Sequence, residues 1–123
     1  MALSQEVLNN LAFANQMGFD KMHLAPPAQT REMMKHAPKN PNPTPVGEVI
    51  NTNITVQIST FSVFITVGVG LFPCISFFHG GGFTLMSIDT HDEICRQLCT
   101  RTKAVVMSVD YALAPENPYP AGI

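Results

Sequence analysis

Three consecutive glycines follow a histidine in the run FHGGGF, which occupies residues 78–83. Glycine sacrifices chain entropy and side-chain packing, so a stable fold retains three in a row where its backbone must approach something closely. Their N–H groups, unshielded by side chains, can converge on one acceptor, as the oxyanion formed during acyl transfer requires. A phosphate cradle uses the same physics, but neither GxGxxG nor GxxxxGKS/T occurs in the chain. The run therefore favours an oxyanion hole over a plain glycine-rich turn.

A second group of polar side chains has the spacing of neighbours on one helical face: His91, Asp92, Cys95 and Cys99. A metal site would need three or four such ligands to converge. The two cysteines, however, interleave with apolar residues on the face that must pack against a sheet, where free cysteine behaves as a small hydrophobe. We therefore expect packing residues here and neither a metal nor a cofactor.

The glycine run lies within a pattern of strand, loop, helix and strand. Residues 74–78 (CISFF) are continuously apolar, which predicts a strand covered on both faces. Thr90 and Glu93 have the spacing of a capping box, which predicts a helix start. Residues 104–109 (AVVMSV) predict a second buried strand, parallel to the first and reached by a right-handed crossover. The buried face of the helix is expected to comprise Ile94, Cys95, Leu98, Cys99 and Thr102.

Two helices and a linker are predicted before this unit. Residues 4–17 follow a helical apolar repeat, with Ser4 as the N-cap and Gly18 as the stop. A second, short helix is expected at residues 29–36. Four prolines within residues 38–45 cannot donate to a regular backbone ladder, so this stretch is expected to be an extended linker.

No Asp, Glu, Lys or Arg occurs between Glu48 and Asp89. Within this stretch, residues 54–59 alternate apolar and polar side chains and residues 61–69 are rich in β-branched and aromatic types, so both predict strands. Residues 61–78 are also about as long as the shortest bilayer span. They contain two glycines and a proline and lack a flanking Lys/Arg bias, which favours buried strands over a membrane anchor.

Composition limits the class of protein further. The chain has 123 residues, 46% of them hydrophobic and 13% charged, which fits a globular chain and excludes a disordered one. Its formal charge of −2 provides no basic stripe for nucleic acid. Three cysteines without CxxC spacing suit a reducing compartment, and the N-terminus lacks the pattern of a signal peptide. A cytoplasmic protein is therefore expected, with its oligomeric state left open.

Two motifs in order, FFHGGGF and DYALAPENPYPA, with SIDTHDEICRQLC between them, resemble the hormone-sensitive-lipase-like branch of the α/β-hydrolases, close to its bacterial carboxylesterases. The resemblance is dense from about residue 73 to residue 121. It implies that Gly81 and Gly82 donate to the oxyanion and that His79, with Gly80, shapes their loop. Asp110, at a strand end, is expected to brace that loop.

The family's nucleophile is a serine in a G-x-S-x-G elbow, followed in the chain by Asp and His. None of the six serines here has glycine at both second-neighbour positions; Ser87 lies in a loop and Ser108 within a predicted strand. The elbow, Asp and His are therefore expected beyond Ile123. Met86 and Ala112 stand where the family form has Gly and Arg, so strain in the loop and loss of a supporting ion pair are expected.

These observations predict an incomplete α/β-hydrolase fold, with N-terminal cap helices, the first strands of the central sheet and its βαβ unit. Residues 1–45 are expected to form cap-like helices and a proline-rich linker, and residues 46–123 the N-terminal part of the core. The implied activity is serine-dependent hydrolysis of a small-molecule carboxylic ester, with this chain alone inactive. The alternatives are a non-catalytic truncated remnant and a membrane-associated protein anchored through residues 61–78.

Overall fold

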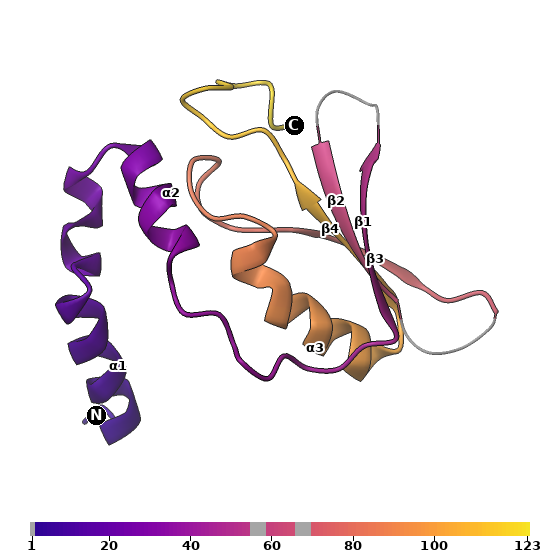
Figure 1. Cartoon of the computed structure of the whole chain (residues 1–123), viewed down its shortest axis with the longest axis horizontal. Coiled ribbons are helices and arrows are strands. Elements are labelled where there is room, and N and C mark those ends of the chain that lie inside the picture. Colours follow the sequence, from indigo (N-terminus) through magenta and orange to yellow (C-terminus); the bar gives the residue numbers. More distant parts are fainter. Residues whose placement is uncertain (1, 55–58, 66–69) are drawn as a thin grey trace.

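The computed structural model describes residues 2–54, 59–65 and 70–123 (Figure 1). Two α-helices and a 3-10 helix, α1 (Gln5–Gln16), η1 (Phe19–Leu24) and α2 (Pro27–Lys35), come first. The strands β1 (Glu48–Ile54), β2 (Ser59–Ile65) and β3 (Cys74–Phe78) follow. A 3-10 turn, η2 (Asp89–His91), the helix α3 (Asp92–Thr102) and the strand β4 (Val105–Asp110) complete the order. The four strands form one sheet in the order β1-β2-β4-β3.

The predicted βαβ unit is confirmed. β3 and β4 are parallel, with Cys74 opposite Val105 and Phe78 opposite Val109, and α3 connects them. β2 pairs antiparallel with β4 on its other side and antiparallel with β1. β4 is therefore an inner strand, and Asp110 lies at its carboxyl end. Of the two upstream strand predictions, residues 55–58 and 66–69 lie outside the described residues.

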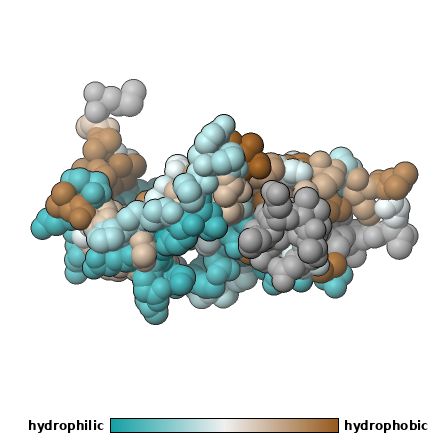
Figure 2. All heavy atoms as spheres, turned by 90° about the horizontal axis from the view of Figure 1, so that it is seen from above, coloured by the Kyte–Doolittle hydropathy of each residue, from teal (hydrophilic) through white to brown (hydrophobic). Residues whose placement is uncertain are grey.

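The N-terminal helix was predicted correctly, but it buries none of its residues. The Ser4 side chain accepts a hydrogen bond from the Val7 amide at 3.4 Å, and Gly18 has a φ of 76°, which suits a helix stop. Its apolar side chains are exposed, Leu11 to 48%. Figure 2 shows brown atoms at the α1 end of the molecule. α2 begins two residues earlier than predicted, because Pro27 is preorganised for the first helical turn.

A small core lies between α3 and the sheet. Cys95, Cys99 and Val106 are fully buried there, and partly buried side chains from β1, β3 and α3 pack around them. Burial raises the pKa of both thiols, so they remain protonated packing groups. The prediction for the helix face was wrong at Ile94, which is 49% exposed, and at Thr102, which is also exposed.

The expectation that β3 is covered on both faces was wrong. Ile75 and Phe77 pack against the core, but Cys74, Ser76 and Phe78 are exposed, Phe78 to 64%. β3 is the last strand in the sheet order, and α3 lies on only one face of the sheet (Figure 1). An apolar run shows that a strand can be buried on both faces, but the covering element must be supplied by another part of the fold.

The structure provides no support for a membrane-spanning helix. Residues 61–65 and 74–78 of the stretch considered as an anchor lie in β2 and β3. Among the residues described, no helix combines the length and the hydropathy needed to cross a bilayer.

The predicted capping box was also wrong. The N-cap of α3 is His91, whose side chain makes no capping hydrogen bond, because the 3-10 turn η2 occupies the expected helix start. Thr90 instead exchanges hydrogen bonds with the backbone of Ser87. The Glu93 carboxylate accepts hydrogen bonds from the Asn40 side chain at 3.1 Å, from the Thr44 amide at 3.0 Å and from the Thr44 hydroxyl. These bonds hold the proline-rich linker against α3.

These hydrogen bonds, chiefly from Thr44 and Gln97, lower the pKa of Glu93 to about 2. The folded-state pKa lies below the ordinary glutamate pKa of 4.5, so Glu93 stabilises the fold above pH 4.5 and its contribution is lost as the pH falls toward 2. We expect a carboxyl titration followed by NMR to place Glu93 near pH 2, and Thr44→Val to move it toward 4.5. An unchanged value in Thr44→Val would contradict this account of the linker.

Candidate functional site

The glycine run forms a tight turn directly after β3. The Gly81 carbonyl accepts from the amides of Thr84 at 3.1 Å and Leu85 at 2.9 Å, and the Thr84 hydroxyl donates to the Gly82 carbonyl. Gly81 has a φ of 115° and Gly82 a φ of 62°. A Cβ on Gly81 would lie 2.1 Å from the Leu85 carbonyl oxygen, so glycine is required there by the loop's own backbone.

The carbonyls of this turn accept hydrogen bonds, but its glycine amides donate none among the residues described. Within the described ranges, the N–H groups of Gly80, Gly81 and Gly82 donate to no backbone or side-chain acceptor. They belong to neither a helix nor a strand ladder. Backbone donors left free at the carboxyl end of a parallel strand are available to an acceptor from outside the chain.

His79 links this turn to the end of β4. Its side chain is buried, and Nδ1 lies 2.8 Å from the Gly80 carbonyl oxygen, where a protonated Nδ1 can donate. The ring stacks on Tyr111 with centroids 4.3 Å apart, and the Tyr111 hydroxyl donates to the His79 carbonyl. Nε2 is buried and finds no hydrogen-bond partner among the described residues. The imidazole is therefore a packed part of the loop's base.

Asp110 faces His79 without bonding to it. Oδ1 lies 3.9 Å from His79 Nε2, beyond hydrogen-bonding distance, and the Asp110 side chain is 39% exposed. Burial raises its pKa, His79 lowers it and Asp89 raises it further. Within the part of the chain that the structure describes, the Asp110 carboxylate accepts no hydrogen bond from a backbone amide. Its link to the glycine loop runs through His79.

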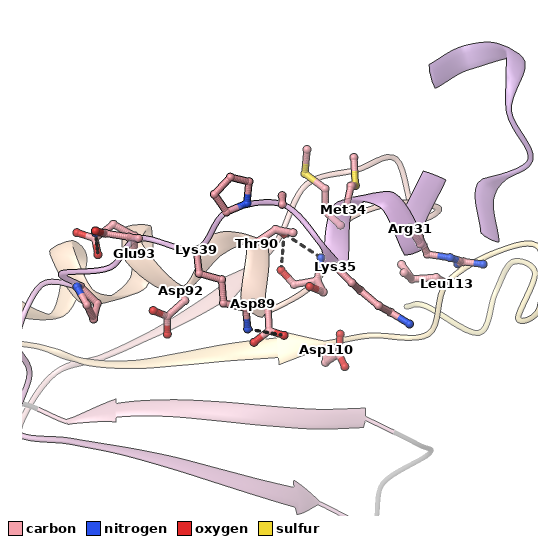
Figure 3. Close-up of a pocket in the computed structure, with 16 residues that line it drawn as sticks. Arg31, Met34, Lys35, Lys39, Asp89, Thr90, Asp92, Glu93, Asp110 and Leu113 are labelled. Carbon is pink, nitrogen blue, oxygen red and sulfur yellow. Dashed lines mark hydrogen bonds and ion pairs between the residues drawn. The ribbon is translucent and has the colours of Figure 1, made fainter. Parts of the chain in front are cut away.

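A cavity of about 740 Å³ lies between the N-terminal segment and the carboxyl end of β4 (Figure 3). Arg31, Lys35 and Lys39 line it on one side and Asp89 and Asp110 on the other, with Lys39 paired to Asp89 at 3.6 Å. Met86 and Ser87 also line it, and the three glycines do not. The cavity therefore adjoins the glycine turn without being formed by it.

The other candidate residues do not converge on the turn. Ser108 is fully buried in β4, and the backbone of Ser87 is bound to the Thr90 hydroxyl. Over residues 2–54, 59–65 and 70–123, no three His, Cys, Asp or Glu side chains are grouped so as to hold a metal ion. The helical spacing of His91, Asp92, Cys95 and Cys99 therefore corresponds to packing and surface positions, with both cysteines buried.

Two residues that sequence reasoning overlooked contact the turn. Tyr111 supplies the ring and hydroxyl that hold His79. Arg31, on α2, donates to the carbonyl of Thr84 at 3.2 Å and to that of Ala114 at 3.3 Å. A lone arginine in a short polar helix carries no sequence signal for contacts 53 and 83 residues away.

The sheet order, the parallel βαβ unit and the glycine turn after β3 define the start of an α/β-hydrolase core. A family model described as "alpha/beta hydrolase fold" matches residues 75–123. Together with the relatives below, this match supports the resemblance to the hormone-sensitive-lipase-like α/β-hydrolases over residues 75–123.

The chain is similar to esterases over different shares of its length. Esterase LipI of Mycobacterium tuberculosis is 57% identical over 51 residues, which are 42% of this chain and 16% of LipI. Carboxylesterase NlhH of the same organism is 53% identical over 51 residues, again 42% and 16%. The ester hydrolase EH1AB1 from the metagenome of Lake Arreo, solved with a derivative of bipyridine phosphonate, matches 98% of this chain at 31% identity with a TM-score of 0.83. This chain covers only 41% of that structure.

Proposed function

We propose that Gly81 and Gly82 supply the oxyanion hole of a carboxylic ester hydrolase. The observation that carries this proposal is the set of free amides at Gly81 and Gly82, held in a turn at the carboxyl end of β3. Two fixed N–H donors would stabilise the negative charge that develops on the carbonyl oxygen as an ester is attacked. One such donor contributes about 3 kcal/mol to the transition state.

The neighbouring residues serve the loop in this proposal. His79 holds the Gly80 carbonyl through Nδ1 and anchors the turn by stacking on Tyr111. Asp110 lies behind His79, with Oδ1 3.9 Å from Nε2. The histidine is buried in this packing, which supports a role in shaping the loop and not as the catalytic base.

We also propose that residues 1–45 are a cap-like unit and residues 46–123 the start of the hydrolase core. The cavity of about 740 Å³ between α2, the linker and the end of β4 is where a small ester would enter, with short-chain or aryl esters as the substrate class. No residue of the chain has the G-x-S-x-G context of a nucleophile. The chain by itself is therefore expected to hydrolyse no ester by the serine route.

A chimera tests the oxyanion proposal. Residues 73–121 of this chain would replace the matching segment of Esterase LipI, and hydrolysis of p-nitrophenyl butyrate would be measured. We expect the chimera to be active, and Gly82→Ala within it to lower kcat about 100-fold, because a φ of 62° disfavours alanine and the amide turns away. The unmodified chain, assayed alongside, is expected to show no turnover sensitive to a serine-directed phosphonate.

Gly80→Ala is the matched control in the chimera. A Cβ there meets nothing within 4 Å and the residue has no positive φ, so kcat should be unchanged. A folded chimera without activity, or equal kcat in the Gly80 and Gly82 variants, would refute the proposal.

A further inference from the structure

Arg31 connects three segments that are far apart in the chain. It lies on α2, its side chain is only 18% exposed, and Nη1 donates to the carbonyls of Thr84 at 3.2 Å and Ala114 at 3.3 Å. Its other terminal nitrogen, Nη2, pairs with the carboxylate of Glu116. A side chain held by two carbonyls and a carboxylate has one defined orientation, which is unusual for an arginine on a short surface helix.

Both carbonyls belong to backbone that is bonded to the glycine turn. The Thr84 amide donates to the Gly81 carbonyl at 3.1 Å, and the Thr84 hydroxyl donates to the Gly82 carbonyl at 3.1 Å. The Ala114 amide donates to the Phe83 carbonyl at 2.8 Å. Arg31 thus ties the far side of the turn to the segment after β4, one hydrogen bond away from each of the two glycines.

The turn needs support from outside because its conformation is unfavourable. Phe83 has a φ of 56° and Met86 a φ of 68°, the left-handed region that side chains disfavour. With Gly81 and Gly82, four positions among residues 81–86 have positive φ. Such conformations persist only where surrounding contacts determine them. Within the described chain, the bonds of Arg31 are the ones that reach this turn from the N-terminal helices.

We propose that Arg31 is a positioning residue that holds the amides of Gly81 and Gly82 in their donor geometry and couples α2 to them. The functional part of this inference rests on the proposed oxyanion hole. The NMR test of the contacts of Arg31 does not depend on that proposal. The planar guanidinium offers several donors in a fixed fork, which lets it span two carbonyls and a carboxylate at once. A lysine at the same position carries its donors on one nitrogen and lacks the planar fork that spans these three acceptors.

The test compares Arg31→Gln and Arg31→Lys with Lys35→Gln in the full chain. Lys35 lies on the same helix, is 70% exposed and pairs only locally with Glu32 among the described residues, so it controls for lost charge on α2. We expect Arg31→Gln to shift the amide NMR signals of Gly81 and Gly82 and to speed about ten-fold the hydrogen exchange of the Thr84 and Leu85 amides, which donate to the Gly81 carbonyl. Arg31→Lys should have a smaller effect, and Lys35→Gln none. Exchange at Val106, in the core, should stay unchanged in all three.

Two results would overturn the proposal. One is glycine signals in the Arg31 variants that match those of Lys35→Gln; the other is a uniform acceleration that includes Val106, which would mark a purely structural role. Should Arg31→Gln fail to fold, Glu116→Gln decides, because it removes one partner of Arg31 and must still shift the two glycine signals. Free guanidinium at millimolar concentration should restore the glycine signals in Arg31→Ala.

The outcome is separable from that of the oxyanion proposal. Shifted glycine signals together with full activity of the Gly82→Ala chimera would support the positioning role of Arg31 and refute the oxyanion hole. Unshifted signals together with an active, Gly82-dependent chimera would refute the positioning role of Arg31 alone.

Discussion

Gly81→Ala is expected to destroy the turn after β3 and to destabilise the chain by about 3 kcal/mol or more. The new Cβ would lie 2.1 Å from the Leu85 carbonyl oxygen and 2.7 Å from its carbon. These are backbone atoms, so no side-chain rotation relieves the overlap, and a φ of 115° is itself unfavourable for alanine. Urea unfolding followed by circular dichroism would measure the loss, and NMR would show displaced amides for residues 81–85.

The neighbouring glycines provide a graded control. Gly80→Ala meets nothing within 4 Å and should leave the free energy of unfolding within about 0.5 kcal/mol of the parent. Gly82→Ala also has open space but a φ of 62°, which predicts a cost of about 1–2 kcal/mol. Equal costs for all three substitutions would show that Gly81 does not lie against the Leu85 carbonyl.

The expected order of destabilisation distinguishes two reasons for a triple glycine, a steric need and the supply of free amides, which the sequence alone cannot tell apart. The run predicted close approach of the backbone to something, and an oxyanion was inferred. In the structure, a Cβ on Gly81 would overlap with the Leu85 carbonyl of its own loop, while the amides of Gly81 and Gly82 remain free. At Gly81, a side chain would overlap with the loop, and the amide is also free to donate. At Gly82 the amide is free as well, but only the positive φ disfavours a side chain. That is why Gly82 is the better probe of function.

Periodicity predicted the elements of the fold better than their ends or their surroundings. Apolar runs identified β3 and β4 because a parallel pair joined by a helix is a local unit of the chain. The capping box failed at Thr90 and Glu93 because Asn40 and Thr44 of the distant linker donate to the Glu93 carboxylate, and a 3-10 turn takes the helix start. Local sequence patterns cannot predict such hydrogen bonds from residues that are distant in the sequence.

The supporting residues of the site were hidden for the same reason. His79 and Asp110 could be singled out because they flank strand ends, but the distance of 3.9 Å between them depends on the register of β3 against β4. Arg31 could not be singled out, because its partners are carbonyl groups, which every residue carries. Recognition of backbone by a side chain leaves no residue-type signature in a sequence.

The stability of the site depends on a very small core. In the portion of the chain described, Cys95, Cys99 and Val106 form its buried centre, and Val106 lies on the inner strand that ends at Asp110. The glycine turn is carried by β3, which pairs with β4 on one side only. A cavity under β4 would therefore loosen both strands that position His79 and Asp110.

Val106→Ala is accordingly expected to lower the free energy of unfolding by about 2 kcal/mol or more, since two buried methyl groups are lost and the rigid sheet cannot close over the gap. Val105→Ala, the preceding residue on the other face of the same strand and only half-buried, should cost less than about 1 kcal/mol. Urea midpoints for both variants, with hydrogen exchange at Val109, would measure the difference. Equal losses in the two variants would show that α3 does not pack on β4 as described, and the site would then lack the support from which its geometry follows.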